Sequence, residues 1–477
     1  MLTPALPTTT PPEEASEVIA RLEAENARLR ERVAELEARL AELEARLRQN
    51  STNSSRPPSS DAPWSKGKRK PPQGPSGRKA GGQPGHEGHA REPVPPEQVD
   101  ETVDVYPDRC GVCGAELQAE VPGEDAHAHQ VTDLPEATAR VTEYRLWRKQ
   151  CPRCGGRTRA KRPSHVPEDA FGPRLKAVVT ALTAKYRVSR REMVDVLRDL
   201  FGVEMSVGAV QAICERVSES VAPAVEEVRL AVASAPAVHA DETGWHQKRE
   251  MHWLWGATTP DAAYFVLADN RGRAALSLLL PDDFAGVVHS DRWRPYERFG
   301  DARQLCHAHL RRDMQAAIDR GGVARPIGKR LLALSDRLFR VWHAYQRGEI
   351  DREQMKRAME PVQARWEEAA GAAFESADGK LSALGLDLLK QWDALWTFVR
   401  VEAVEPTNND AERALRPAVL WRRGSFGTRS DVGSTFVARL LTVVHTAKRR
   451  RVGVVAWLQD ACDRAAAGLA PPPLLSG

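Results

Sequence analysis

The stretch Val238-His-Ala-Asp-Glu-Thr-Gly-Trp245 decides the fold of this chain. Its apolar beginning predicts a short strand, and the acidic pair Asp241 and Glu242 falls at the end of that strand. Four more strand patterns follow, at 252–258, 263–268, 286–291 and 303–309. A helical pattern at 272–280 separates the third strand from the fourth, and the fourth strand ends on Asp291. The sequence therefore predicts a mixed α/β unit with carboxylates at two strand ends.

Three strands, a helix and two further strands are the order of an RNase H-like fold, whose sheet can bring the ends of its first and fourth strands together. We assign residues 236–315 to the first part of this α/β core. Residues 316–400 are mostly helical and too long for a connecting loop, so they are expected to form a helical insertion. The core resumes over 401–460, and 461–477 is expected to be a tail.

The third acidic candidate lies in the returning segment, within Pro406-Thr-Asn-Asn-Asp-Ala-Glu-Arg-Ala-Leu-Arg-Pro417. Asn408 or Asn409 is expected to cap a helix that carries Glu412 inward. From 413 to 451 ten basic residues face one acid, which favours a partner rich in phosphate. The candidate phosphate contacts in and near this segment are Arg311, Arg312, Arg413, Arg416, Arg422, Arg423 and Arg429. Three glycines, Gly424, Gly427 and Gly433, would let the backbone approach a phosphate closely.

Residues 16–50, after an expected disordered start at 1–15, carry a heptad pattern. Leucine recurs at 22, 29, 36 and 43, and Ile19, Asn26, Val33 and Leu40 lie three positions earlier. This pattern predicts a coiled coil, and a buried Asn26 would pair best with its twin in a parallel homodimer. A single solvated helix is the alternative.

Residues 51–100 are dominated by Ser, Pro and Gly, which predicts a flexible linker. Eight basic and two acidic residues lie between 56 and 91, so this linker is also a candidate arm for binding nucleic-acid phosphates. The basic candidates are Lys68, Arg69, Lys70, Arg78 and Lys79. A linker that only keeps the chain in solution is the alternative.

Two C-x2-C pairs, Cys110 with Cys113 and Cys151 with Cys154, follow within residues 101–168. Four thiolates can close a tetrahedral Zn2+ site, and strand-like sequence at 139–147 between the pairs suggests a zinc ribbon. Such a site is structural, because it leaves no open position for water. A redox role is disfavoured, since neither pair opens a helix in a βαβ unit.

Residues 169–235 are expected to be a helical, DNA-binding region. Ser189-Arg-Arg-Glu192 is a capping box that starts one helix, and the turn from Phe201 to Ser206 leads into a second. Helix, short turn and helix is the helix-turn-helix pattern, which would place residues 207–218 near a DNA groove. Any pair of antiparallel helices can produce a similar pattern.

The composition of the 477 residues fits a soluble protein rather than a membrane-embedded one. Charged residues make up 28%, the net charge is only +4, and seven cysteines are too few for a disulfide scaffold. The first 14 residues lack the features of a signal peptide, and no long uncharged apolar stretch occurs. A cytoplasmic location without a membrane is therefore expected.

Several of these stretches together resemble the transposases of the insertion sequence 66 family. They are Asp241-Glu-Thr-Gly-Trp245, Asp291 after its strand, Cys306-His-Ala-His-Leu-Arg-Arg312 and Asn408-Asn-Asp-Ala-Glu-Arg-Ala-Leu-Arg-Pro417. The order of coiled coil, basic linker with Gly81-Gly-Gln-Pro-Gly-His86, zinc ribbon and core resembles the family over nearly the whole chain.

The resemblance implies that Asp241, Asp291 and Glu412 are the Asp-Asp-Glu triad of a DNA transposase. Their oxygens would hold two Mg2+ or Mn2+ ions, with Asp241 bridging both and Glu242 the nearest competitor. The implied partners are the element's terminal repeats, target DNA and accessory proteins from the same element. The alternatives are a related nuclease that cuts without joining, and a transposase-derived DNA-binding protein with an inactive core.

Overall fold

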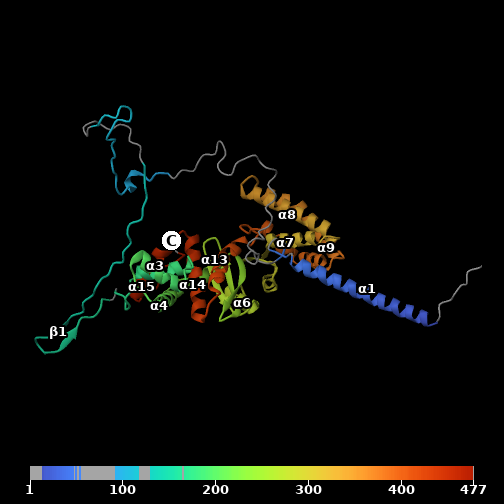
Figure 1. Cartoon of the computed structure of the whole chain (residues 1–477), viewed down its shortest axis with the longest axis horizontal. Helices are drawn as coiled ribbons and strands as arrows, with labels where there is room; N and C mark the ends of the chain where they lie inside the picture. Colours follow the sequence, from blue (N-terminus) through green and yellow to red (C-terminus); the bar gives the residue numbers. More distant parts are fainter. Residues whose placement is uncertain are drawn as a thin grey trace, which may run out of the picture.

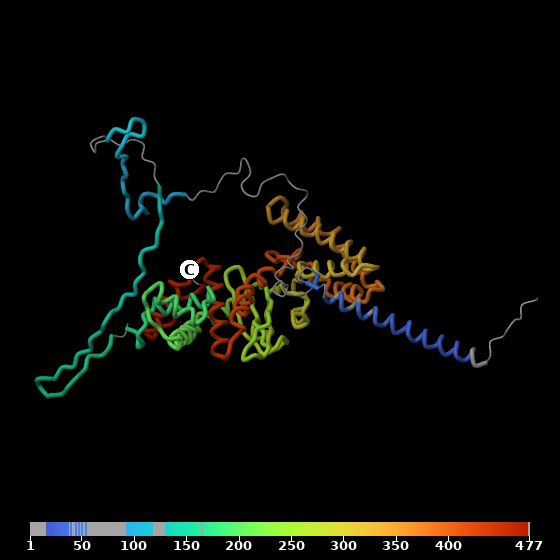
Figure 2. Tube along the Cα trace, viewed as in Figure 1, coloured from blue at the N-terminus to red at the C-terminus, as the bar shows by residue number. Residues whose placement is uncertain are grey.

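The computed structural model describes residues 13–47, 49–50, 53–54, 92–117, 129–163 and 166–475. The sheet lies near the middle of the molecule, between a helical group containing α3, α4 and α15 and a second group containing α7, α8 and α9 (Figures 1 and 2). The described strands are β1 (Arg148–Gln150), β2 (Arg157–Arg159), β3 (Ala237–Gln247), β4 (Glu250–Thr258), β5 (Ala263–Ala268), β6 (Val287–Ser290) and β7 (Arg303–Leu305). The described α-helices are α1 (Glu13–Leu47), α2 (Pro173–Ala184), α3 (Arg190–Phe201), α4 (Val207–Ser220), α5 (Ala222–Ala233), α6 (Arg273–Leu279), α7 (His307–Arg320), α8 (Ala324–Gln346), α9 (Arg352–Phe374), α10 (Gly379–Lys390), α11 (Trp392–Leu395), α12 (Thr397–Arg400), α13 (Asn409–Ser425), α14 (Asp431–Arg449) and α15 (Val454–Ala466). Two 3-10 helices are η2 (Pro96–Gln98) and η3 (Arg294–Phe299).

The central sheet has the strand order β5-β4-β3-β6-β7. β3, β4 and β5 are antiparallel neighbours, whereas β6 pairs parallel to β3 and β7 pairs parallel to β6. The predicted order of three strands, a helix and two strands is therefore confirmed. The fifth strand is shorter than predicted: it ends at Leu305, and His307 already begins α7. Leu310, Met314 and Ala317 form a buried stripe with helical spacing that favours the helix.

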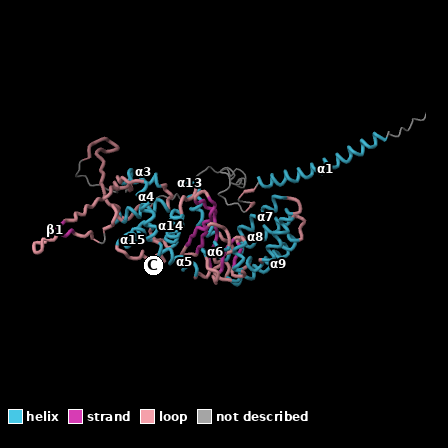
Figure 3. The backbone as a smooth tube through the Cα atoms, turned by 90° about the horizontal axis from the view of Figure 1, so that it is seen from below, coloured by secondary structure: helices cyan, strands magenta, loops and turns pink. Residues whose placement is uncertain are grey.

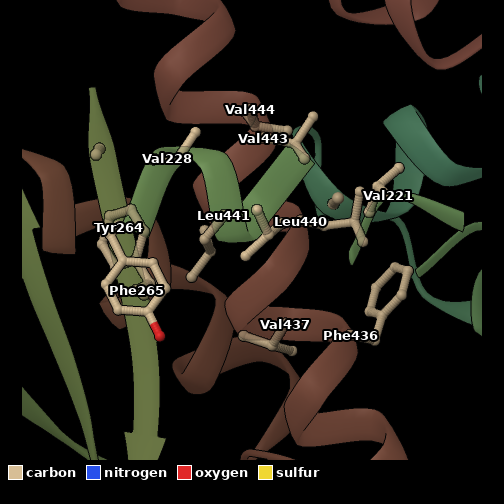
Figure 4. Packing of buried hydrophobic residues seen from close by; sticks show 14 of the residues in the cluster. Val221, Val228, Tyr264, Phe265, Phe436, Val437, Leu440, Leu441, Val443 and Val444 are labelled. Carbon is tan, nitrogen blue, oxygen red and sulfur yellow. The ribbon is translucent and has the colours of Figure 1, made fainter. Parts of the chain in front are cut away.

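The edge strand β5 is covered by α14. Side chains of α14 pack between Tyr264 and Phe265 of β5 on one side and the helices before the sheet on the other (Figure 4). The hydroxyls of Thr442 and Thr446 also accept hydrogen bonds from the backbone N–H groups of Phe265 and Ala263, at 3.0 and 3.1 Å. Because these N–H groups are otherwise an unpaired sheet edge, α14 protects β5 from pairing with another chain.

Helices α2 to α5 form a layer on the same core. The capping box at Ser189 and Glu192 is present, and Gly202 ends α3 in the left-handed conformation with φ 62°. The predicted helix pair is thus confirmed, but α4 packs against α2, α14 and α15 and buries Val210, Ile213 and Val217. The opposite face of α4, with Arg216 and Glu219, is exposed, so its placement near a DNA groove stays a prediction.

The helical insertion has a hydrophobic core of its own, built by α7 to α12 around Trp342, Trp366 and Trp396. It begins nine residues before the predicted boundary at 316, because α7 is continuous from His307. The predicted tail at 461–477 is also wrong. Ala461 and Cys462 are buried in α15, and Leu474 is 3% exposed and packs on the core.

Helix α1 extends from the rest of the chain as a single long helix (Figures 1 and 3). Its heptad leucines are about half exposed, from 49% at Leu43 to 55% at Leu29. The start before residue 13 and the five predicted basic contacts of the linker, Lys68, Arg69, Lys70, Arg78 and Lys79, lie outside the described residues. No helix in the described part of the chain is long and apolar enough to cross a membrane.

Candidate active site

The pairing of β3 with β6 places two acids side by side. His239 of β3 is in register with His289 of β6, and the two strands run parallel. Asp241 and Asp291 each follow the paired histidine by two residues, so they lie at matching levels on the same face of neighbouring strands. The histidine rings stack with centroids 3.9 Å apart directly below this level.

Glu412 joins this edge of the sheet from the first turn of α13. Asn408 is the N-cap residue, but its side chain makes no capping hydrogen bond, contrary to the prediction. Instead the fully buried amide donates to the carbonyl of Ala240 at 2.7 Å. This bond joins the start of α13 to the residue before Asp241, which brings Glu412 to the strand that carries Asp241.

Helix α7 supplies two cations to Glu412. Arg312 Nη2 lies 3.5 Å from Glu412 Oε2, and His309 Nε2 lies 3.3 Å from Oε1. Both groups are three residues apart and therefore share one face of α7. The start of α7 is tied to the segment before α13, because the His307 N–H donates to the carbonyl of Pro406 at 2.9 Å. The two motifs with Cys306 and Asn408 thus meet in space.

The carboxylates of this site repel one another. Burial raises the pKa of the Asp241 carboxyl well above its usual range, and the charges of Glu242, Asp291 and Glu412 raise it further, while His309 opposes the shift. Mutual repulsion of this kind requires that the acids be neighbours. Asp291 and Glu412 therefore lie near enough to Asp241 for their charges to act on it, and their joint role stays a prediction.

Glu242 has a different role from its neighbour. Its carboxylate is fully buried, accepts a hydrogen bond from Tyr296 Oη at 2.8 Å and forms an ion pair with Arg271 at 2.5 Å. Arg271 also reaches Asp291, at 3.9 Å, and lies over the ring of Trp293 at 4.2 Å. Since both Glu242 oxygens already have partners, Glu242 holds Arg271 rather than competing for a metal ion.

Two observations test whether a divalent cation fits this site. The negative charges of neighbouring acids raise the pKa of Asp241, and Glu412 Oε1 is buried with no hydrogen bond, only the ion pair to His309 at 3.3 Å. Hard carboxylate oxygens are the ligands that Mg2+ and Mn2+ prefer, so the donor set fits. Within the described residues, however, no three Asp, Glu, His or Cys side chains are already close enough to hold one ion together.

The basic candidates divide into two groups. Arg311 pairs with Asp336 at 2.7 Å, Arg312 pairs with Glu412, and Arg422 donates to the carbonyl of Gly244, so these three serve contacts within the protein. The exposed candidates are Arg413, Arg416, Arg423 and Arg429. Of these four, Arg413 pairs with Asp410 at 3.5 Å, whereas Arg416, Arg423 and Arg429 have no ion pair within the described residues and are available to a phosphate backbone.

The cysteine pairs form matching turns. In each pair the first cysteine accepts from the glycine four residues on and donates to the carbonyl five residues on, with Gly114 and Gly155 at φ 74° and 71°. Backbone hydrogen bonds from Cys113 and Cys154 lower the pKa of Cys110 and Cys151, which favours the thiolate needed to bind zinc.

The two turns are not assembled into one four-cysteine cluster among the described residues. The strand-like stretch at 139–147 is not a strand, although the carbonyl of Trp147 accepts from the N–H of Ala160 at 2.9 Å, and the paired strands β1 and β2 flank the second cysteine pair instead.

Arg271, Tyr296 and Asn408 are the site residues that the sequence reasoning missed. Arg271 follows β5 and Tyr296 lies in η3, so nothing in their local pattern marks them. The Asn-Asn motif did point to Asn408, but as a helix cap.

Family models of known proteins match three parts of the chain. Residues 169–435, more than half of the chain, match the family model described as "Transposase IS66 family". Residues 107–155 match the zinc-finger binding domain of the same transposases, and residues 7–92 match a family of unknown function.

Two relatives come from Sinorhizobium fredii and are named as uncharacterized proteins. One, y4hP, is 24% identical over 79% of this chain and 74% of its own length, and the other, y4qI, is 25% identical over 66% and 63%. The family match over the helical layer, the sheet and α13 carries the assignment: the chain belongs to the IS66 family of transposases.

Proposed function

We propose that this chain cuts DNA at the ends of an insertion element and joins those ends to target DNA, with an RNase H-like core. The observation that carries the proposal is the register of β3 and β6, which sets Asp241 beside Asp291 while Glu412 adds to the raised pKa of Asp241. Family membership supports the same activity.

In this proposal Asp241, Asp291 and Glu412 hold the divalent ions. When bound, Mg2+ or Mn2+ activates a water or a 3′-hydroxyl and offsets the charge that develops on the phosphate. Arg312 and His309 orient the Glu412 carboxylate, and Glu242 holds Arg271 so that it comes no closer to Asp291 than 3.9 Å. The attacking oxygen replaces the leaving oxygen at phosphorus, so no protein side chain forms a covalent intermediate.

Structural zinc at Cys110, Cys113, Cys151 and Cys154 is part of the proposal. The lowered pKa of Cys110 and Cys151 and the zinc-finger family match support it. The two turns would have to approach each other for one ion to bind all four thiolates.

Single substitutions of the three acids test the activity. In Asp241→Asn, Asp291→Asn and Glu412→Gln, Mn2+-dependent cleavage of a labelled duplex carrying the element's flanking DNA is expected to fall about 100-fold or more, because each loses a metal ligand. Binding of the same duplex should persist. Asp301→Asn, an exposed acid near the sheet, is the matched control. Full cleavage by all three variants would refute the assignment.

Two further assays separate the alternatives. A nuclease that cannot join strands would cleave but would not transfer a pre-cleaved 3′ end into a second duplex. A transposase-derived DNA-binding protein would bind the duplex and show no cleavage at any Mg2+ or Mn2+ concentration.

A further inference from the structure

An exposed phenylalanine stands at the far end of the helix that carries Glu412. The Phe426 side chain is 84% exposed, directly after α13. Its backbone is left-handed with φ 59°, which costs a residue other than glycine roughly 1 kcal/mol. A large apolar side chain held outward in a strained conformation contributes nothing to the folded core. Phe426 is therefore a candidate for contact with a binding partner.

The loop that holds Phe426 is fixed to the catalytic strand. Thr428 N–H donates to the carbonyl of His246 at 2.8 Å, and Lys248 N–H donates back to Thr428 at 3.0 Å, as in a short added strand. Gly427 has φ 94°, and a Cβ there would lie 2.0 Å from the His246 carbonyl oxygen. The close approach that Gly427 permits is thus to β3, not to a phosphate as predicted from the sequence.

A stripe of exposed arginines leads from Glu412 to this loop. At 100° per residue, Arg416 and Arg423 lie within about 40° of Glu412 around α13. Both are exposed, and neither has an ion-pair partner within the described residues. Arg429 continues the positive charge beyond Phe426. The rise of α13 puts Phe426 about 20 Å from Glu412, about six base pairs of DNA.

The charge around Phe426 indicates which class of partner it can bind. From 420 to 430 the charged residues are Arg422, Arg423 and Arg429, and the next acid, Asp431, is paired with Lys248 at 3.0 Å. A second copy of this surface would be repelled. A polyanion with flat apolar faces, by contrast, matches both the arginines and the phenyl ring.

We propose that Phe426 stacks against a nucleobase of the bound DNA, while Arg416 and Arg423 hold the phosphates between that base and the acids and Arg429 holds a phosphate beyond it. The inference rests on the proposed function only in taking DNA as the ligand. The base comes either from a duplex step opened by the ring or from an unpaired nucleotide, since both present the same face.

Fluorescence anisotropy of three probes without added divalent metal tests the inference: a blunt 30-base-pair duplex, the same duplex with two unpaired central nucleotides, and a single strand. Phe426→Ala and Phe426→Asn should each weaken binding about 5- to 100-fold, and Phe426→Trp should not. Asparagine tolerates the left-handed backbone, so a shared loss by Ala and Asn cannot come from misfolding alone. A loss on the blunt duplex identifies an opened step, and a loss confined to the other probes identifies an unpaired base.

Salt dependence separates the ring from the arginines. Phe426→Ala should leave the slope of log affinity against log salt unchanged, whereas Arg416→Ala and Arg423→Ala should each reduce it by about one. Phe374→Ala, which removes a 46% exposed phenyl from α9, is the matched control and should change neither.

Near-native affinity of both Phe426→Ala and Phe426→Asn on every probe, in a chain that binds DNA, overturns the inference and leaves the proposed function standing. So does a change in sedimentation mass without a change in affinity, which would identify a protein contact. A chain that binds but never cleaves contradicts the proposed function alone.

Discussion

At the scale of single residues, adjacent acids have opposite surroundings. Asp241 lies among other carboxylates, whereas Glu242 is buried between Arg271 and Tyr296. The charge of Asp291 raises the pKa of Glu242 as well, but both Glu242 oxygens already have partners, so these partners distinguish the two acids.

Glu242→Gln is therefore expected to impair metal use rather than remove a ligand. Without the Glu242 charge, Arg271 loses its partner at 2.5 Å and can move closer to Asp291, now 3.9 Å away, where its charge opposes metal binding. The Mn2+ concentration for half-maximal cleavage should rise about 10- to 100-fold, the usual cost of losing a residue that supports a metal ligand. A metal titration of the cleavage rate measures this.

Glu250→Gln, an exposed acid at the start of β4, is the control and should behave as the native chain does. An unaltered metal requirement in a folded Glu242→Gln variant would show that Arg271 is not held away from Asp291 by Glu242.

At the scale of elements, α1 carries the heptad pattern of a coiled coil on an exposed surface. Its apolar stripe is exposed along the whole helix, including Leu29 at 55% and Leu36 at 51%. A helix of 35 residues with such a stripe is stable only when another helix covers it. The parallel homodimer remains a prediction.

Replacing Leu29 and Leu36 together with Glu should convert a dimer into a monomer, because charges would enter two core layers. Sedimentation equilibrium of the full chain gives the mass directly. Replacing Glu31 and Glu37, which lie off the apolar seam, with Gln should leave the mass unchanged. A double-leucine variant with the native mass would contradict the coiled-coil dimer.

At the scale of the whole molecule, each of the two hydrophobic cores has a histidine whose lowered pKa makes the free energy of unfolding depend on pH. His307 is fully buried in the core of the insertion, donates from Nε2 to the carbonyl of Leu395 at 2.9 Å, and has no partner at Nδ1. Burial lowers its pKa to about 4, and burial likewise lowers the pKa of His445, beside the sheet, to about 4.

Between pH 6.5 and about 4, His307 is protonated in the unfolded chain but not in the folded chain. The free energy of unfolding therefore rises with pH through this window. The stabilising contribution of His307 is fully present above about pH 6.5. For His307 alone the loss from pH 7 to 5 is about 2 kcal/mol.

Urea denaturation at pH 7 and pH 5 measures that loss. His307→Gln should reduce the difference by about 2 kcal/mol, whereas His343→Gln, an exposed histidine, should not. Equal losses in all three chains would place the acid sensitivity elsewhere.

The sequence alone determined what depends on local pattern: the heptads of α1, the two cysteine pairs, the helix pair with its capping box, and the five strands with their terminal acids. Periodicity and spacing carry these features, because each is set by residues within a few turns of one another. Only the tertiary structure decided what depends on distant partners. It gave Asp241 and Glu242 different partners, bonded Asn408 to Ala240 instead of capping α13, packed one face of α4 on the core, and divided the arginines into internal and exposed groups. Those outcomes follow from contacts between residues 25 to 178 positions apart, such as Asn408 with Ala240, 168 positions apart, which no local pattern encodes.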